Sequence, residues 1–229
     1  MVTASVLAAG GIGINWEGAT VLHVTGTDRI AGGAFRVPPD RLEAATLALA
    51  AAITGGTVHL DSFPTIDFPT GLVAVFANAG IELTSMNGGT LARCPAGPRA
   101  VQTATGPHPA FPTDVQPQLT AFLTQAPGTS RIEEQIYTDR GTHVGPLRAF
   151  GAAVNADGSV ITVCGPAPLV AADVAGKDIR AVTAMLIAAL AAEGTSTIQG
   201  MYHLRRGYGS LLPKLAALGA ELTIDQEMP

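Results

Sequence analysis

Lysine is scarce in this 229-residue sequence, and the shortage limits the kinds of partner that the protein can bind. Only two lysines occur, Lys177 and Lys214; charged residues make up 14% of the chain and the formal net charge is -5. A nucleic-acid-binding surface needs concentrated positive charge, so no nucleic-acid partner is expected. Of the 13 basic residues the remaining eleven are arginine, whose planar side chain suits bidentate binding of carboxylate and phosphate groups.

Cysteine and long apolar runs are also scarce. Cys94 and Cys164 lie far apart and have neither a paired CxxC spacing nor a nearby histidine cluster, so we expect no metal site and no other cofactor. We interpret both as reduced residues of the core. No apolar run reaches the length needed to cross a bilayer, and residues 1–5 lack the basic start of a signal peptide. The sequence therefore indicates a cytoplasmic protein without a membrane partner.

Hydrophobic residues, by contrast, make up 47% of the chain, enough for a sizeable core, and they occur in three similar segments. Each segment has an aspartate, an Ala- and Leu-rich run, a glycine with Thr or Ser, a strand pattern, a second helical pattern and a Gly-containing turn. Gly56, Gly128 and Gly194 mark the same point, at intervals of 72 (56 to 128) and 66 (128 to 194) residues. Such regularity indicates stacked copies of one unit. We place the repeats at residues 36–105, 106–172 and 173–229.

The residue pattern within the repeats predicts the fold class. The helical runs 44–53 and 181–192 are apolar on every face, which is typical of helices buried on all sides. The strand patterns 57–61 and 195–199 alternate, which suits sheets with one face in water. The fold class is therefore α/β, with helices inside and sheets outside. Residues 1–35 contain a helix end and two or three strands, which we interpret as the remnant of an adjoining domain with crossover strands.

The run from Gly106 to Gln116 holds the first candidate for chemistry. Its three prolines fix the backbone and hold Thr113 and Asp114 at a defined position before a helical pattern. Asp114 has two possible roles. As a helix N-cap it would accept hydrogen bonds from free N–H groups, and as a general base it would take the proton of a substrate hydroxyl.

Aspartates stand at the same place in the other two segments. Asp40 is followed by Arg41, and Asp178 is followed two positions later by Arg180. If the three helices run parallel, their positive N-terminal ends point the same way and attract a phosphate or a carboxylate. The alternative is that Asp40 and Asp178 cap their own helices and pair with the local arginines.

Two further arginines occupy equivalent places. Arg140 follows Gly128 by 12 residues, and Arg206 follows Gly194 by 12 residues. A pair at equivalent strand-to-helix junctions suggests a ligand clamp, whereas either arginine alone would be ordinary surface charge.

Histidines and a glutamate flank these positions. His108, His143 and His203 are not paired with a Ser or Cys nucleophile, so we expect supporting hydrogen bonds from them rather than catalysis. Glu134, which alternates with Glu133 along a strand pattern, is a further candidate.

In their order along the chain, these motifs resemble the UDP-N-acetylglucosamine 1-carboxyvinyltransferases, which belong with 5-enolpyruvylshikimate-3-phosphate synthase to the enolpyruvyl transferase superfamily. The matching motifs are long and cover almost the whole chain: Pro39 to Glu43, Pro107 to Gln116, Arg140 with His143 and Val144, Asp178 to Ala181, and Arg206 to Tyr208. The resemblance implies an inside-out α/β barrel-like domain of three βαβαββ-type repeats, with buried parallel helices and outer sheets.

The resemblance also implies an activity, the transfer of the enolpyruvyl group of phosphoenolpyruvate to a substrate hydroxyl. Asp114 matches the family's proposed base, and Arg206 matches an arginine of the phosphoenolpyruvate pocket. Family positions that bind substrate correspond to Thr113, Tyr137, Arg140, Asp178, Arg180, Asp40 and His108. Among these, Thr113 and Tyr137 would line the sugar-nucleotide site.

The resemblance is confined to the family's C-terminal half. The family's N-terminal lysine and the cysteine on its mobile loop belong to the other half, and Cys94 does not correspond to that cysteine. We therefore expect a half-enzyme whose active site is completed by a separate partner chain, the alternative being a piece of a longer enzyme. Gly141 stands where the family has a large aromatic residue, which leaves open whether the acceptor is a UDP-sugar or another nucleoside. A non-catalytic binding or scaffold homologue is the second hypothesis.

Overall fold

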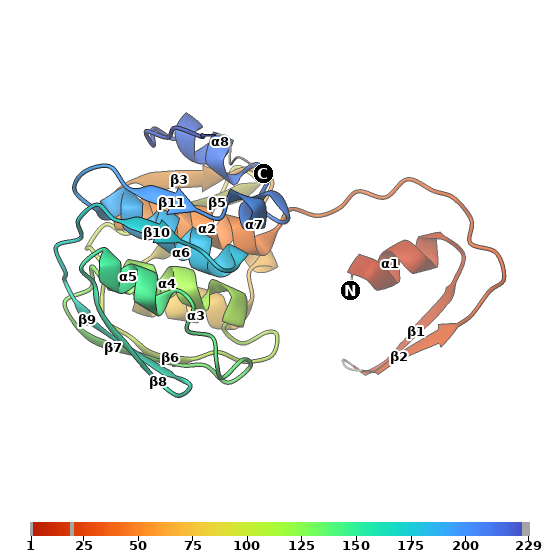
Figure 1. The fold of residues 1–229 in the computed structure, drawn as a ribbon. Helices are drawn as coiled ribbons and strands as arrows, with labels where there is room; N and C mark the ends of the chain where they lie inside the picture. Colours follow the sequence, from red (N-terminus) through yellow and green to blue (C-terminus); the bar gives the residue numbers. More distant parts are fainter. Residues whose placement is uncertain (1, 19–20, 226–229) are drawn as a thin grey trace. The chain divides into compact units, whose positions relative to one another are not determined.

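The chain forms two compact units, residues 1–40 and residues 41–229, in the computed structural model (Figure 1). The structure describes residues 2–18 and 21–225. In the first unit, helix α1 (Val2–Ala9) precedes an antiparallel hairpin of strands β1 (Gly13–Glu17) and β2 (Val21–Thr25). Residues 19, 20 and 226–229, which the predicted strands and the third repeat include, lie outside the described part.

The second unit alternates helices and strands, as the sequence predicted. Its elements in chain order are α2 (Arg41–Ile53), β3 (Thr57–Leu60), η1 (Thr65–Asp67), α3 (Thr70–Asn78), β4 (Glu82–Met86), β5 (Gly89–Arg93), β6 (Gln102–Ala104), η2 (Thr113–Val115), α4 (Gln116–Leu123), β7 (Gly128–Glu133), α5 (Val144–Ala149), β8 (Ala153–Asp157), β9 (Val160–Gly165), β10 (Asp173–Ala175), α6 (Ile179–Ala191), β11 (Thr197–Gln199), α7 (Met201–Arg205) and α8 (Leu211–Ala217). The strands form three sheets, in the orders β3-β5-β4, β6-β7-β9-β8 and β10-β11.

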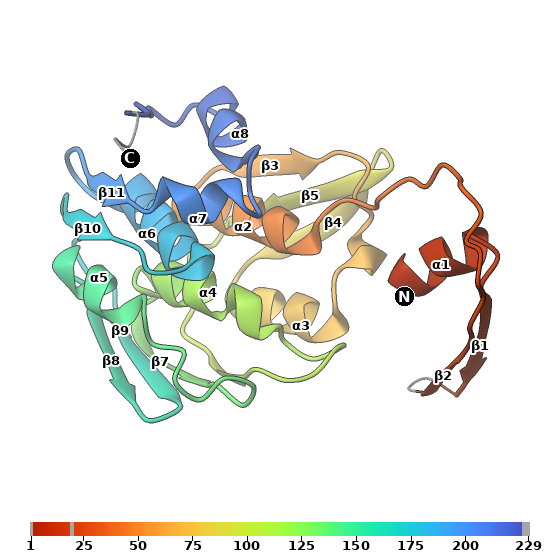
Figure 2. The ribbon, with the colours of Figure 1, turned by 45° about the vertical axis from the view of Figure 1, so that its right-hand side comes forward.

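Helices α2, α4 and α6 contact one another in the centre of this unit, and the sheets lie around them (Figure 2). All eight residues of α4 are buried, and α6 is buried from Ala181 through Ala188. The apolar helices that the sequence placed in the core are therefore there. In β7, burial alternates, with Ser130 and Ile132 facing the core and their neighbours facing outward. The prediction of sheets with one face in water is confirmed.

The buried helices also contain threonines, whose hydroxyls need partners away from water. Each of the three helices meets this need in the same way. Thr46, Thr120 and Thr183 donate to the backbone carbonyls of Leu42, Gln116 and Ile179, four residues earlier in each helix. These back-bonds let polar side chains lie in a helix core without an unpaired hydroxyl.

The last helix of each segment ends at a glycine with positive φ. Gly80, Gly151 and Gly219 have φ of 95°, 91° and 103°. The amide of the residue after each glycine bonds back to a carbonyl five residues earlier, in the pairs Ile81 to Phe76, Ala152 to Leu147 and Ala220 to Leu215. This 6→1 bond is the Schellman C-cap, which a residue with a Cβ adopts only under strain.

The elements β6, α4, β7, α5, β8 and β9 follow one another as a βαβαββ unit, which begins at β6 (Gln102–Ala104), before the boundary that we predicted at residue 106. The third segment begins in the same way, because β10 pairs in parallel with β11 as β6 does with β7. A serine hydroxyl accepts the backbone N–H of the incoming strand in both, from Val101 to Ser130 and from Ala172 to Ser196. Within the described residues, however, the third segment has no strand after α8.

One prediction about the core is wrong. Cys94 is buried, but Cys164 is exposed on the outward side of β9, between the buried Val163 and the end of the strand. We assigned Cys164 to the core because cysteine is small. The alternation of inward and outward side chains along β9, however, turns Cys164 outward. Among the described residues, no helix is long and apolar enough to span a membrane.

The C-cap glycines give a direct test of the backbone geometry. Gly219→Ala should lower the free energy of unfolding by about 1–2 kcal/mol, because alanine is strained at positive φ while nothing lies within 4 Å of the added Cβ. Gly141→Ala is the matched control, since Gly141 has no positive φ and equal space around an added Cβ, and the substitution should be neutral or stabilising. Urea unfolding measures both. An equal effect of the two substitutions would contradict the assigned cap.

Candidate active site

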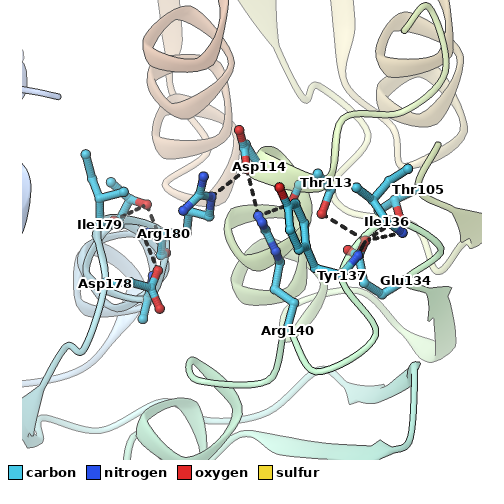
Figure 3. Close-up of polar contacts among 12 residues, drawn as sticks. Thr105, Thr113, Asp114, Glu134, Ile136, Tyr137, Arg140, Asp178, Ile179 and Arg180 are labelled. Carbon is cyan, nitrogen blue, oxygen red and sulfur yellow. Dashed lines mark hydrogen bonds and ion pairs between the residues drawn. The ribbon is translucent and has the colours of Figure 1, made fainter. Parts of the chain in front are cut away.

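A carboxylate shared by two arginines is at the centre of the candidate site (Figure 3). Asp114 Oδ1 accepts hydrogen bonds from Arg140 Nη1 at 2.7 Å and from Arg180 Nε at 2.5 Å. Arg140 Nη1 also donates to the carbonyl of Thr113 at 2.9 Å. These residues come from η2, from the loop after β7 and from the first turn of α6. The fold therefore brings together four of the predicted site positions.

The local backbone explains the position of Asp114. Pro112 adopts an extended conformation before η2, and its carbonyl accepts the N–H of Val115 at 3.1 Å. The N-cap of α4 is Val115, which makes no side-chain cap, so the proposed capping role of Asp114 is wrong. The carboxylate points to the arginines instead.

The charges of the cluster stabilise one another. Burial acts to raise the pKa of Asp114, but the hydrogen bonds and positive charges of Arg180 and Arg140 outweigh burial and hold that pKa below its ordinary value. Asp114 is therefore ionised at neutral pH and acts only as an acceptor. The Arg140 side chain is 10% exposed and the Asp114 side chain 32%, so the pair is shielded from screening by salt but still reachable from solvent.

Asp178 does cap its helix, as one of the two alternatives predicted. Its Oδ1 accepts the backbone N–H groups of Arg180 and Ala181 at 2.9 and 3.1 Å, and its Oδ2 accepts the hydroxyl of Thr142 at 2.6 Å. Burial raises the pKa of Asp178, while these donors lower it more, and the net pKa lies below the ordinary value. Both oxygens are thus engaged within the protein.

A cleft of about 470 Å³ opens beside the cluster. Its lining includes the predicted residues Tyr137, Arg140, Asp178 and Arg180. Tyr137 is 58% exposed, and the centroid of its ring lies 4.7 Å from the Arg140 guanidinium carbon. The cleft thus offers an aromatic face and two guanidinium groups beside the carboxylates of Asp139 and Asp178. The guanidinium groups and the ring suit an anionic ligand with a planar part.

Glu134 is the buried anchor of the loop that carries Tyr137 and Arg140. Its side chain is almost fully buried, and a single oxygen, Oε1, accepts four hydrogen bonds of 2.8 to 3.0 Å. The donors are the hydroxyls of Thr105 and Thr113 and the backbone N–H groups of Ile136 and Tyr137 (Figure 3). The other oxygen, Oε2, is buried without a hydrogen-bond partner among the described residues. Glu134 thereby connects Thr113, next to Asp114, with the loop that forms the cleft.

His143 lies behind the cluster at the start of α5. It is fully buried, and neither ring nitrogen has a hydrogen-bond partner among the described residues. Burial lowers the pKa of His143 to about 4, with a nearby Asp178 raising it and Arg140 lowering it. The ring is therefore neutral at pH 7 and supports the cluster by packing, not by the hydrogen bonds that we predicted.

Two predicted site residues, His108 and Arg206, make no hydrogen bond or ion pair with the cluster among the described residues. His108 is exposed in the loop before η2. Arg206 is exposed at the end of α7, with its guanidinium carbon 5.7 Å from the Tyr202 ring. The next residue, Gly207, packs so closely on Ile179 at the start of α6 that a Cβ there would lie 2.7 Å from its Cδ1. Asp40 is the last residue of the N-terminal unit.

Two contributors were under-rated by reasoning from sequence. Thr142 was not singled out, and Glu134 was only a further candidate without a role. One signal in the sequence could have indicated the role of Glu134. This glutamate directly follows an alternating strand pattern and precedes a loop that carries Tyr137 and Arg140. The partners Thr105 and Thr113 lie 29 and 21 residues away, so the network itself cannot be read from spacing.

A comparison with protein families agrees with this geometry. The sequence model described as EPSP synthase (3-phosphoshikimate 1-carboxyvinyltransferase) matches residues 1–215. The chain belongs to this family of enolpyruvyl transferases.

Curated relatives are longer than this chain. The UDP-N-acetylglucosamine 1-carboxyvinyltransferase of Trichlorobacter lovleyi is 39% identical over 212 residues, which are 93% of this chain and 50% of the relative. That of Afipia carboxidovorans is 40% identical over 213 residues, 93% of this chain and 49% of the relative. The chain spans about half the length of these relatives, and the matched part is their C-terminal half.

Solved structures show the same fold. The enolpyruvyl transferase NikO from Streptomyces tendae superimposes with a TM-score of 0.82 at 25% identity, over 95% of this chain and 52% of that one. EPSP synthase from Acinetobacter baumannii superimposes with a TM-score of 0.77 at 20% identity, over 98% and 55%. The mixed α/β fold and the resemblance to enolpyruvyl transferases are confirmed.

Removing the Glu134 acceptor should destabilise the protein. Glu134→Ala leaves four donors without their partner and should lower the free energy of unfolding by about 3 kcal/mol or more, whereas Glu134→Gln keeps one oxygen acceptor and should cost less. The control is Glu133→Ala, which removes a half-exposed ion pair with Arg131 and should change stability by no more than about 1 kcal/mol. Urea unfolding gives the energies, and faster hydrogen exchange at Ile136 and Tyr137 would locate the damage. If Glu133→Ala and Glu134→Ala lower the free energy of unfolding equally, Glu134 does not anchor the loop.

Burial of His143 should make stability depend on pH. Its folded pKa of about 4 lies below the ordinary value of 6.5, so protonation favours the unfolded chain. The stabilisation is present above pH 6.5 and is lost as the pH falls from 6.5 toward 4, by a total of about 3 kcal/mol. His143→Gln should remove this part of the pH dependence, while His108→Gln, at an exposed histidine, should keep it. Unfolding curves between pH 4 and 7.5 measure how the free energy of unfolding of each variant depends on pH. If this dependence is the same in His143→Gln and in the unaltered chain, His143 is not its cause.

Proposed function

We propose that this chain is one subunit of an enolpyruvyl transferase, which moves the enolpyruvyl group of phosphoenolpyruvate to a hydroxyl of a UDP-sugar or another nucleoside, and whose active site is completed by a partner chain. The observation that carries the proposal is the ionised Asp114 held by Arg140 and Arg180, two residues that line an open cleft. The description of the fold as an inside-out domain of three βαβαββ repeats with parallel buried helices is part of the same proposal.

In the proposed reaction, the acceptor oxygen bonds to carbon 2 of phosphoenolpyruvate. The hydroxyl proton passes to a base, and the methylene carbon gains a proton. Phosphate then leaves while the methyl carbon gives up a proton, which restores the double bond. Such chemistry needs a base, an acid and cations near the carboxylate and phosphate. We assign the base to Asp114 and expect the acid from the partner chain.

The two arginines give Asp114 a way to become a base only when substrate is present. With both guanidinium groups bound, its pKa is too low for effective proton abstraction at neutral pH. A phosphate or carboxylate in the cleft competes for Arg140 and Arg180, because anions with several oxygens suit the planar guanidinium. When an arginine turns to the substrate, the carboxylate loses a donor and its basicity rises.

The remaining predicted residues take roles in binding. Tyr137 presents an exposed ring for the sugar nucleotide, and Thr113 lies beside the base. Asp178 orients the start of α6 and so the Arg180 side chain. Arg206, exposed on a segment that packs against α6, is proposed to bind phosphoenolpyruvate. Asp40 and His108 are proposed substrate contacts on the strength of the resemblance alone.

The proposal of a partner chain rests on length. The relatives in which this activity is named are about twice as long, and the matched part is their C-terminal half. A cleft with one wall of catalytic groups and an exposed aromatic ring is consistent with a site between two protein surfaces.

Replacing the proposed base tests the activity. The unaltered chain, mixed with the separately expressed N-terminal half of the Trichlorobacter lovleyi relative, phosphoenolpyruvate and UDP-N-acetylglucosamine, should release phosphate. Asp114→Asn keeps the size of the side chain but removes its basicity, and it should lower kcat by roughly 10²- to 10⁴-fold. Phosphate release in a coupled assay measures the rate.

The matched control is Asp157→Asn at the exposed end of β8, which should keep full activity. Equal activity of Asp114→Asn and Asp157→Asn would exclude Asp114 as the base. If calorimetry detects no binding of phosphoenolpyruvate in the mixture, the alternative of a non-catalytic scaffold homologue is favoured.

A further inference from the structure

Two of the three segments insert their last strand between two earlier ones. β5 lies between β3 and β4, and β9 lies between β7 and β8, antiparallel to both neighbours. The third segment has the outer positions of this arrangement. β11 corresponds to β3 and β7, and residues 221–225 follow the C-cap Gly219 as β4 follows Gly80 and β8 follows Gly151.

The middle position of the third segment is a groove of about 760 Å³. One wall is residues 194–199, which include β11, and the other is residues 221–225. Apolar side chains of α6 and α8 line it between these walls, namely Leu186, Leu190, Leu212 and Leu215. Within the described residues β11 pairs only with β10, so the β11 edge that faces the groove carries no ladder.

The filled positions predict how a strand would fit the groove. In the second segment Val163 of β9 faces Ser130 on one side and Val154 on the other. By the same register, a residue of the missing strand would face Ser196 and Leu222. Two positions away, a second residue would face Ile198 and Ile224, as Ile161 of β9 faces Ile132 and Ala156.

Exposure of apolar side chains agrees with a missing neighbour. Leu222 is 37% exposed, whereas Val154 at the corresponding place beside β9 is 4% exposed. Ile198 is half-buried, whereas Ile132 is fully buried. Ile224 is 52% exposed. Leu222 and Ile224 both line the groove, so a strand placed there would cover both.

We propose that this groove takes up one β-strand of the partner chain, antiparallel to β11 and to residues 221–225, with two apolar side chains facing the helices. The inference rests on the partner chain of the proposed function. A strand is the fitting occupant because β5 and β9 fill the corresponding place in the other two segments, and because strand addition satisfies an unpaired edge such as that of β11. The partner is its source because the matched part of the relatives is their C-terminal half, which leaves their other half to supply a strand.

Hydrogen exchange with the N-terminal half of the Trichlorobacter lovleyi relative as the probe tests the proposal. The Thr197 N–H already donates to the carbonyl of Ala172 at 3.1 Å, so the N–H of Ile198, the next along the strand, is the one that faces the groove. The backbone amides of Ile198 and of residues 221–225 should exchange rapidly in the chain alone and at least tenfold more slowly in the mixture, whereas that of Thr197 should change little.

Leu222→Asp should weaken the association, measured as Kd by calorimetry, by about tenfold to a hundredfold, because it removes a buried apolar contact. Thr223→Asp, on the opposite side of the same segment, is the matched control and should leave Kd within about threefold.

Other occupants give different results. Protection of these amides in the isolated monomer would show that the chain fills its own groove, and protection that grows with its concentration would show a second copy; either result overturns the proposal. No association with the probe, or association without protection, also overturns it. The proposed function can fail separately. If the amides are protected and Kd depends on Leu222, but the mixture releases no phosphate, the proposed strand is upheld and the proposed activity is contradicted.

Discussion

The packing of α2, α4 and α6 against one another is the constraint on which the rest of the structure depends. Because these helices are buried on nearly all sides, their ends cannot be oriented independently, and the polar groups at those ends must find partners among themselves. Arg180 in the first turn of α6 thus meets Asp114 at the entrance to α4, across 66 residues of sequence. The acid–arginine cluster is a product of the core and not of a local motif.

Partly buried charges are tolerated here because each is paired, and the two arginines are balanced by the ionised Asp114 and Asp178. Arg140 and Arg180 share one carboxylate, while the second nearby acid, Asp178, is engaged by the N–H groups of α6 and by Thr142. His143 adds no charge at neutral pH. Since Asp178 is held by the N–H groups of α6 and by Thr142, an anion that enters the cleft competes mainly with Asp114 for the two guanidinium groups.

The sequence predicted the features that follow from hydrophobic periodicity and composition. It did not predict the contacts between side chains that lie far apart along the chain. Helices apolar on every face had to be buried, and a recurring glycine had to end a helix. The role of Asp114 could not be decided, because a helix cap and a general base require the same residue in the same place, and its bonds to Arg140 and Arg180 were not foreseen. The four-fold acceptor role of Glu134 depends on Thr105 and Thr113, which only the folded chain brings to it. Cys164 was misplaced because residue type was given more weight than strand alternation.

Helix α6 connects the two incomplete features of the molecule. Its first turn carries Arg180, which belongs to the cleft, and its second half carries Leu186 and Leu190, which line the groove beside β11. Ten residues separate Arg180 from Leu190, which corresponds to about 15 Å along a helix. A strand bound in the groove would therefore hold a partner to this chain without occupying the cleft, and the substrate site would stay open between the two. The helix that positions Arg180 at one end would thus provide a docking surface at the other.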